Sequence, residues 1–568
     1  MKFSIRERVA NHLNLIYGAD ITLDIIDRCM ELLEHYREKI PRHEGNTWDN
    51  SEIVLITYGD TINESWQRPL LSLRYFLNKY LYDIFSTVHI LPFFPYSSDD
   101  GFSVIDYHKV NPELGTWGDI RKIRSNFKLM FDLVINHVSV KSKWFQQFLK
   151  GEAPGKDFFI VPDAGDNLTK VIRPRSSPLL TPFETASGIK HVWTTFSADQ
   201  VDLNFKNPRV FFEILKVLMH YLEEGARVIR LDAIAFLWKE PGTNCLHLPK
   251  THEFVRLFRT IMEHVAPGSI LLTETNVPNK ENLSYFGKGD EARIIYQFSL
   301  PPLLLHALYA GTSKYLTAWA RSVPEPPEGC TYFNFTASHD GIGVRPLEGV
   351  LPPGEIEDLI QGVMKNGGLV STRKNQDGKD IPYELNITYL DALKTGRDSS
   401  DQYHIQRFIC SQLIMLALKG IPGIYIHSIL GTPNDHEGVK NTGINRSINR
   451  MKWDLTELEH HLKENPVQSG IFNILRKHIH KRLNEKAFHP DGTQEIPDYG
   501  SRFFVITRKY EGRQVVCISN VTSEKVTFRQ FNKFNDTWYI DMLSAQRYSR
   551  DKNEVVLEPY QTVWLTTI

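Results

Sequence analysis

The segment ARVIRLDAIAF, from Ala226 to Phe236, sets a pattern that recurs along this chain. It is short, rich in β-branched residues and nearly continuous in hydrophobicity, and it carries Arg230 and Asp232 toward its end. Strands that are buried on both faces of a parallel sheet have this composition. The other runs of this kind are EIVLITYG from Glu52, STVHILPFF from Ser86, LMFDLVINH from Leu129, SILLTETN from Ser269, ARIIYQFSL from Ala292, TYFNFTASHD from Thr331 and GIPGIYIHS from Gly420.

Amphipathic helical stretches separate most of these runs. Over residues 211–224, for example, Phe211, Leu215, Leu218 and Leu222 recur at helical spacing. Eight strands that alternate with helices predict an α/β fold, a (β/α)₈ TIM barrel. The alternative is an open doubly wound sheet. It is disfavoured because polar residues follow many of the runs, where a barrel would gather them around one mouth.

Two longer excursions interrupt the alternation, and both ends of the chain differ from its middle. The excursion after the third run is rich in Pro, Gly and Asp, and the one after the seventh holds the polar stretch STRKNQDGKD from Ser371. Insertions of this size are usually functional. The predicted units are a helical N-terminal extension (1–50), three barrel parts (51–137, 207–341 and 395–485), an inserted subdomain (138–206), a loop-rich insertion (342–394) and a C-terminal antiparallel β domain (486–568).

Composition excludes several classes of protein. The 568 residues carry 66 basic and 67 acidic side chains, so there is no electrostatic reason to expect nucleic acid or an anionic membrane as partner. The most apolar long run, 408–426, contains Lys419 and Pro422 and predicts a core helix followed by a strand, not a membrane span. The N-terminus lacks the apolar core of a secretion signal, and the five cysteines are scattered, so we expect a cytoplasmic protein. The oligomeric state stays open.

Four polar segments follow predicted strands, and they are DLVINH (132–137), RLD (230–232), TETN (273–276) and SHDG (338–341). Each is weak alone, because a polar residue at a strand end is more often structural. Together and in this order they resemble the four short motifs of the α-amylase superfamily of retaining α-glucoside enzymes. The resemblance covers most of the chain from about residue 50. It implies a barrel, an insertion after the third strand and a C-terminal β-sandwich, in agreement with the organisation predicted from the residues.

Retaining cleavage of a glucoside needs a carboxylate nucleophile and a carboxylic acid about 5–5.5 Å apart. The resemblance implies that Asp232 is the nucleophile, Glu274 the acid/base and Asp340 a third carboxylate that binds sugar hydroxyls. Arg230 lies two residues before Asp232, on the same face of the strand, and is expected to keep it ionised. Glu274 needs a raised pKa so that it is protonated when the leaving group departs.

Outside these motifs the sequence resembles the sucrose phosphorylase branch of the superfamily, through HILPFFPYSSDDGFSVIDYHKV, RPRSSPLLTPF, VWTTFSADQVDLN, QFSLPPLLLHAL and NRSINR. The glucose-site residues that this resemblance implies are Asp100 paired with Arg446 at the far end, Phe102 and Phe196 as aromatic lining, and His137 and His339 as hydroxyl-binding histidines. Asn136 matches a calcium-ligand position of many α-amylases. The branch works without metal, so we expect no metal and no cofactor.

A phosphorylase needs a cation near its catalytic carboxylates, because phosphate is repelled by them. Arg175 and Tyr383 match acceptor-loop residues of the branch. Further candidate cations are Arg173, Arg373, Lys374 and Lys379.

The identity of the leaving group is indicated by a segment that differs from the corresponding segment of sucrose phosphorylases. Sucrose phosphorylases carry Asp-Leu-Tyr-Gln where this chain has Ile381-Pro382-Tyr383-Glu384, so Glu384 enters the acceptor side and sucrose is in doubt. The N-terminal extension and the strings TPFETASG, PYELNITYLDAL and YIHSILGTPND resemble glucosylglycerate phosphorylases of the same branch.

The expected reaction converts 2-O-α-D-glucosyl-D-glycerate and inorganic phosphate into α-D-glucose 1-phosphate and D-glycerate, through a glucosyl ester of Asp232. The partners are thus a small α-glucoside and phosphate. Three alternatives keep the fold: sucrose, sucrose 6′-phosphate or glucosylglycerol as donor; an α-glucosidase that uses water; and a non-catalytic amylase-like protein. The last is disfavoured because Asp232, Glu274 and Asp340 are all present.

Overall fold

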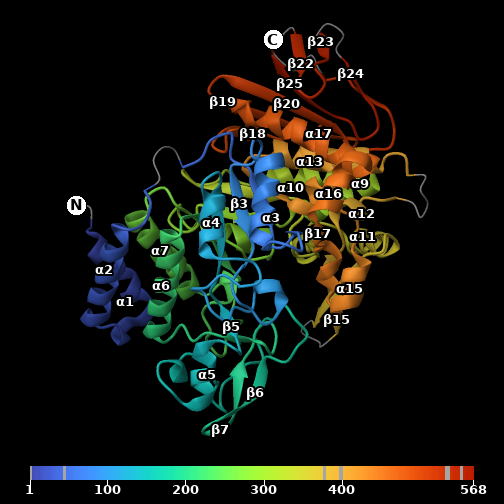
Figure 1. Ribbon diagram of the computed structural model, residues 1–568. Coiled ribbons are helices and arrows are strands. Elements are labelled where there is room, and N and C mark those ends of the chain that lie inside the picture. The colour runs from blue at the N-terminus through green and yellow to red at the C-terminus, as the bar shows by residue number, and fades with distance from the viewer. Residues whose placement is uncertain are drawn as a thin grey trace.

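Eight parallel strands close into a barrel at the centre of the computed structural model (Figure 1). They are β1 (Val54–Thr57), β3 (Thr87–Ile90), β4 (Lys128–Val134), β9 (Ala226–Asp232), β10 (Ile270–Thr273), β11 (Ile294–Tyr296), β12 (Thr331–Phe335) and β16 (Ile421–Tyr425). Around the barrel the order is β1, β3, β4, β9, β10, β11, β12 and β16, which pairs again with β1. The predicted barrel is confirmed, and each of the eight apolar runs supplies one strand. The structure describes residues 3–42, 47–374, 379–395, 401–530, 538–549 and 554–567.

Helices lie in the connections between the barrel strands and after the last strand, β16. They are α3 (Pro69–Phe76), α4 (Trp117–Arg124), α6 (Pro208–Glu223), α7 (Pro249–Val265), α8 (Asn279–Leu283), α9 (Leu300–Ala310), α10 (Lys314–Ser322), α13 (His404–Ala417), α16 (Leu455–Glu464) and α17 (Pro466–Leu483). Helix α6 shows why they form: Asn207 caps its N-terminus, Pro208 occupies the first turn, and the predicted apolar face is buried. No helix in the described ranges is long and apolar enough to cross a membrane.

Two insertions extend from the barrel. After β4 come β5 (His137–Ser139), α5 (Lys143–Lys150), β6 (Leu180–Thr185), β7 (Gly188–Trp193) and β8 (Gln200–Asp202). After β12 come β13 (Ile342–Gly343), α11 (Pro353–Lys365), β14 (Leu369–Lys374), β15 (Asp380–Asn386) and α12 (Tyr389–Ala392). The second insertion is more regular than the predicted loop-rich segment, because β13, β15 and β14 form an antiparallel sheet. Residues 375–378 of this insertion lie outside the described residues.

The two ends of the chain pack on the outside of the barrel. Helix α1 (Ile5–Tyr17) and α2 (Leu23–Arg37) lie beside α6 and α7 (Figure 1). In the C-terminal part a sheet contains β18 (Thr493–Glu495), β19 (Phe503–Tyr510), β20 (Arg513–Asn520), β22 (Trp538–Asp541), β23 (Arg547–Ser549) and β25 (Thr562–Thr567), and β21 (Val526–Phe528) pairs with β24 (Val555–Leu557). Figure 1 places the C-terminal part and the first insertion at opposite ends of the molecule.

The barrel wall includes one position that only glycine fits. Gly423 lies on β16 between Val54 of β1 and Phe335 of β12. A Cβ atom on Gly423 would overlap the ring of Phe333, which fills the barrel interior. Interiors are packed too tightly to absorb an added methyl group without displacement.

We predict that Gly423→Ala lowers the free energy of unfolding by about 1–3 kcal/mol, because the methyl group overpacks the barrel. Gly470→Ala is the matched control: a Cβ on Gly470 in α17 meets no atom, and alanine favours a helix by up to about 1 kcal/mol. Urea unfolding of both variants measures the difference. A neutral Gly423→Ala would contradict this account of the barrel wall.

Candidate active site

The register of three neighbouring strands brings the central polar residues together. Asp132 on β4 lies opposite Arg230 on β9. On the other side of β9, Thr273 of β10 lies opposite Leu231, so that Glu274 emerges level with Asp232. The carboxyl ends of parallel barrel strands all face one mouth, where barrel enzymes hold their active sites.

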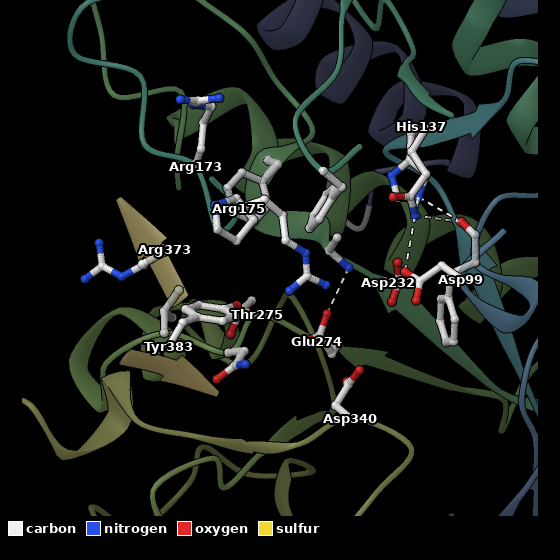
Figure 2. Close-up of a pocket in the computed structure, with 18 of the residues that line it drawn as sticks. Asp99, His137, Arg173, Arg175, Asp232, Glu274, Thr275, Asp340, Arg373 and Tyr383 are labelled. Carbon is white, nitrogen blue, oxygen red and sulfur yellow. Dashed lines mark hydrogen bonds between the residues drawn. The ribbon is translucent and has the colours of Figure 1, made fainter. Parts of the chain in front are cut away.

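A single buried guanidinium contacts all three of these carboxylates. Arg230 Nη1 lies 2.8 Å from Asp232 Oδ1 and also donates to Asp132, while Nη2 lies 3.9 Å from Glu274 Oε2. The Ala233 backbone N–H donates to Glu274 Oε2 at 3.0 Å. Because both Asp232 and Glu274 reach one guanidinium, they lie close together around one space (Figure 2).

Burial changes the pKa values of Asp232 and Glu274. Burial raises the pKa of Glu274, and the charge of Asp340 adds to that rise. Burial also raises the pKa of Asp232, and Arg230 opposes the rise through its direct hydrogen bond. Arg230 bonds Asp232 at hydrogen-bond length and Glu274 only at 3.9 Å, a difference that favours the negative charge on Asp232 and the proton on Glu274.

Asp340, which follows β12, is held differently. Arg446 Nη1 lies 2.6 Å from Asp340 Oδ1. Burial alone would raise the pKa of Asp340, but Arg446 and the other nearby arginines outweigh it and lower that pKa. The lowered pKa favours an ionised Asp340 in the same pocket where burial raises the pKa of Glu274.

Aromatic rings and histidines also line the pocket, and His339 Nε2 lies 3.5 Å from Asp340 Oδ1. Phe102 stacks on His339 with ring centroids 4.7 Å apart, and His137 packs on Phe196 at 5.1 Å. His137 Nε2 lies 2.9 Å from the Phe102 carbonyl. Burial lowers the pKa of both histidines, so they face the pocket as neutral hydrogen-bonding groups.

Most of the residues predicted for the site line one pocket of about 770 Å³, measured with its open mouth. They are Asp232, Glu274, Asp340, Phe102, His137, Arg175, Phe196, His339, Tyr383 and Arg446. Of the further candidate cations, Arg173 and Arg373 also line it. The side chain of Lys374 lies outside the described residues.

The predicted pair of Asp100 and Arg446 is wrong. Asp100 instead accepts a hydrogen bond from Arg450 at 2.5 Å and lines a separate hollow beside Tyr58. Its neighbour Asp99 lines the catalytic pocket, 3.8 Å from Arg446. Both aspartates have positive φ, 53° and 46°, and their side chains point to different spaces, which no composition pattern could reveal.

Glu384 and Arg230 are placed behind the pocket wall instead of on its surface. Glu384 is 1% exposed and accepts two hydrogen bonds from Arg446, at 2.9 and 2.7 Å, and one from the Gly341 N–H at 2.7 Å. It fixes Arg446 and does not line the pocket. Sequence reasoning missed Asp99, Gln200 and Arg345 among the lining residues. The SSDDG segment was the one available signal for Asp99.

The position that resembles a calcium ligand holds a lysine side chain. The Lys239 ammonium lies 2.6 Å from Asp202 Oδ2 and donates to Asn136 Oδ1, and both charged side chains are buried. These oxygens are therefore occupied by an internal cation and do not fit a calcium ion. Among the described residues, no group of three or more His, Cys, Asp or Glu side chains could hold a metal ion.

Comparisons with known proteins agree with this geometry. The α-amylase catalytic domain family matches residues 78–324. Over 567 residues the chain is 42% identical to the glucosylglycerate phosphorylase of Escherichia coli, covering 99% of this chain and 100% of that protein. It is 44% identical over 579 residues to the glucosylglycerate phosphorylase of Spirochaeta thermophila, covering 99% and 98%. The chain belongs to the sucrose phosphorylase branch of the α-amylase family.

A solved structure from this branch has the same fold. The sucrose 6F-phosphate phosphorylase from Thermoanaerobacter thermosaccharolyticum superposes with a TM-score of 0.72 at 29% identity, over 83% of this chain and 94% of that one. The resemblance predicted from sequence is thereby confirmed.

We predict that Lys239→Met lowers the free energy of unfolding by about 3–5 kcal/mol, because it leaves the buried Asp202 carboxylate without its cation. Asp202→Asn combined with Lys239→Met should recover part of that loss. Lys440→Met is the control: Lys440 pairs with Glu437 at 4.0 Å on an exposed helix, and its loss should leave the midpoint unchanged. Urea unfolding measures the stability of all three variants. If Lys239→Met were as stable as the wild type, Lys239 would not be the stabilising counterion of Asp202.

Proposed function

We propose that the protein is a retaining glycoside phosphorylase, which converts 2-O-α-D-glucosyl-D-glycerate and phosphate into α-D-glucose 1-phosphate and D-glycerate. The observation that carries the proposal is the pair of buried carboxylates on Arg230 beneath an arginine-lined mouth. The two full-length relatives support glycerate as the leaving group.

In the first half of the reaction, Asp232 attacks the anomeric carbon. The bond between that carbon and the glycosidic oxygen breaks as Glu274 gives its proton to the oxygen, and D-glycerate leaves. A glucosyl ester of Asp232 remains. Asp340, an anion held by Arg446, accepts hydrogen bonds from sugar hydroxyls that strengthen as the ring flattens.

In the second half, an oxygen of phosphate attacks the same carbon and the ester bond to Asp232 breaks. Glu274, now ionised, takes up the proton when hydrogen phosphate is the nucleophile. Two inversions at one carbon give retention, so that the product is α-D-glucose 1-phosphate. Asp232 and Glu274 return to their starting states.

Phosphate must reach the ester ahead of water. Arg175 supports this preference: its guanidinium points toward Glu274 in Figure 2 and packs over the Tyr383 ring, 5.9 Å from its centroid. Its charge offsets the repulsion between phosphate and the acidic pocket. Phe102 and Phe196 add apolar surface to the lining of the pocket.

We predict that the enzyme with phosphate releases glucose 1-phosphate from glucosylglycerate faster than from sucrose, sucrose 6′-phosphate or glucosylglycerol.

We also predict that Asp232→Asn loses phosphorolysis by several orders of magnitude with its melting temperature preserved, because the amide removes the nucleophile and not the packing. Phosphate-dependent product formation measures both. Turnover of glucosylglycerate by water at an equal rate would identify a hydrolase, and preference for another glucoside would overturn the choice of leaving group.

We predict a bell-shaped pH dependence of kcat/KM for the glucoside. The rate falls as pH rises through the raised pKa of Glu274, since the acid form is required. It falls as pH drops and Asp232 takes a proton, at a higher pH than for an ordinary aspartate because burial raises the pKa of Asp232.

Glu274→Gln separates the two limbs. The variant should lose glucosylglycerate turnover and keep formation of the glucosyl ester from α-D-glucosyl fluoride, whose leaving group needs no acid. If kcat/KM of the residual activity of this variant still fell at high pH as it does in the wild type, Glu274 would not be the acid.

A further inference from the structure

Four arginines surround the mouth of the catalytic pocket. Arg173, Arg175, Arg345 and Arg373 line the pocket that holds the catalytic carboxylates, and the same four line the open space outside it. The first two come from the insertion after β4, and the other two from the insertion after β12. In Figure 2 Arg175 points toward Glu274, whereas Arg173 and Arg373 lie farther from it.

Arg345 is held in place by the small sheet of the second insertion. It follows β13, whose residue Gly343 pairs with Glu384 on β15. The Val344 N–H donates to the Tyr383 carbonyl at 3.0 Å, and the next residues, Pro346 and Leu347, are buried. The backbone that carries Arg345 is therefore tied to the strand that carries Tyr383.

The other cations of this pocket already have partners: Arg446, Arg175 and Arg373 contact carboxylates, and Arg173 donates a hydrogen bond to the Ser177 carbonyl. Arg446 bonds Asp340 and Glu384. Arg175 lies 4.0 Å from Glu384, and Arg373 lies 3.3 Å from Glu348. Arg345 differs, because over the described residues its guanidinium makes no ion pair or hydrogen bond, and its Nε is buried without a partner. A half-buried guanidinium without a counterion favours an anionic ligand.

The leaving group of the proposed reaction is an anion of matching shape. In a 2-O-linked glycerate the carboxylate is attached to the carbon that bears the glycosidic oxygen, so it enters the pocket beside the scissile bond. A guanidinium binds a carboxylate through two parallel hydrogen bonds. We propose that Arg345, supported by Arg373, binds the carboxylate of the leaving group, while Arg175 serves phosphate. This inference rests on the proposed function.

Arg345 then selects against neutral leaving groups. A neutral alcohol in the same place would leave the Arg345 guanidinium desolvated and unpaired, which is more costly than a missing contact. The residue thus determines the specificity of the first half-reaction and takes no part in the second.

Arg345→Gln tests this division with two donors, each in the presence of phosphate. With glucosylglycerate, kcat/KM should fall between about 10- and 100-fold, the range for a lost charged hydrogen bond. With α-D-glucosyl fluoride, which brings no carboxylate, kcat/KM and the KM for phosphate should stay at wild-type values. Arg345→Lys should recover part of the loss, because it keeps the charge but not the fork. Arg175→Gln is the contrasting variant and should raise the KM for phosphate with both donors.

The possible outcomes distinguish carboxylate binding by Arg345 from a structural or phosphate-binding role. Equal losses with both donors would assign Arg345 to pocket structure or to phosphate and overturn the inference, as would no loss with either. Arg321→Gln, an exposed arginine in α10, controls for the change in net charge, and melting temperatures control for folding. A wild-type enzyme that turns over glucosyl fluoride with phosphate but not glucosylglycerate would contradict the proposed function itself.

Discussion

The buried guanidinium of Arg230 carries the one interaction on which the catalytic arrangement depends. It bonds Asp132 and Asp232 and lies 3.9 Å from Glu274, so a single positive charge stabilises three carboxylates that would otherwise repel one another. His89 and Arg230 outweigh burial and lower the pKa of Asp132 to about 2, so Asp132 stays ionised and keeps Arg230 in place. In the proposed mechanism, the unequal distances from Arg230 to Asp232 and Glu274 favour charge on the nucleophile and a proton on the acid.

The barrel and its insertions make separate contributions to the pocket. The strands supply Asp232 and, just beyond their ends, Glu274 and Asp340, on a rigid frame with little room for change. The insertions supply the arginines of the mouth: Arg173 and Arg175 lie in the loop before β6, Arg345 follows β13, and Arg373 lies on β14. In the proposed mechanism, the barrel therefore carries the residues of bond cleavage, and the insertions carry those that bind the leaving group and phosphate.

The barrel and the three carboxylates could be predicted because their signals are local. A buried strand is a continuous apolar run, and each carboxylate directly follows one. Residues that depend on distant pairing could not be predicted. Which of the neighbouring aspartates Asp99 and Asp100 faces the pocket is decided by backbone torsion. Glu384 looked like a ligand contact because its role depends on Arg446, 62 residues away. Arg345 gave no sequence signal, since its place depends on strand pairing with Tyr383.

Lys239 has a consequence for the conditions under which the enzyme can work. Its ammonium, tethered to the chain, occupies the oxygens of Asn136 and Asp202 where many relatives of this superfamily hold calcium. Millimolar phosphate sequesters free calcium. An enzyme that consumes phosphate and depends on a bound calcium ion for stability would therefore be destabilised by its own co-substrate. A cation supplied by the polypeptide cannot be extracted in this way, so phosphate does not remove the positive charge that pairs with Asp202.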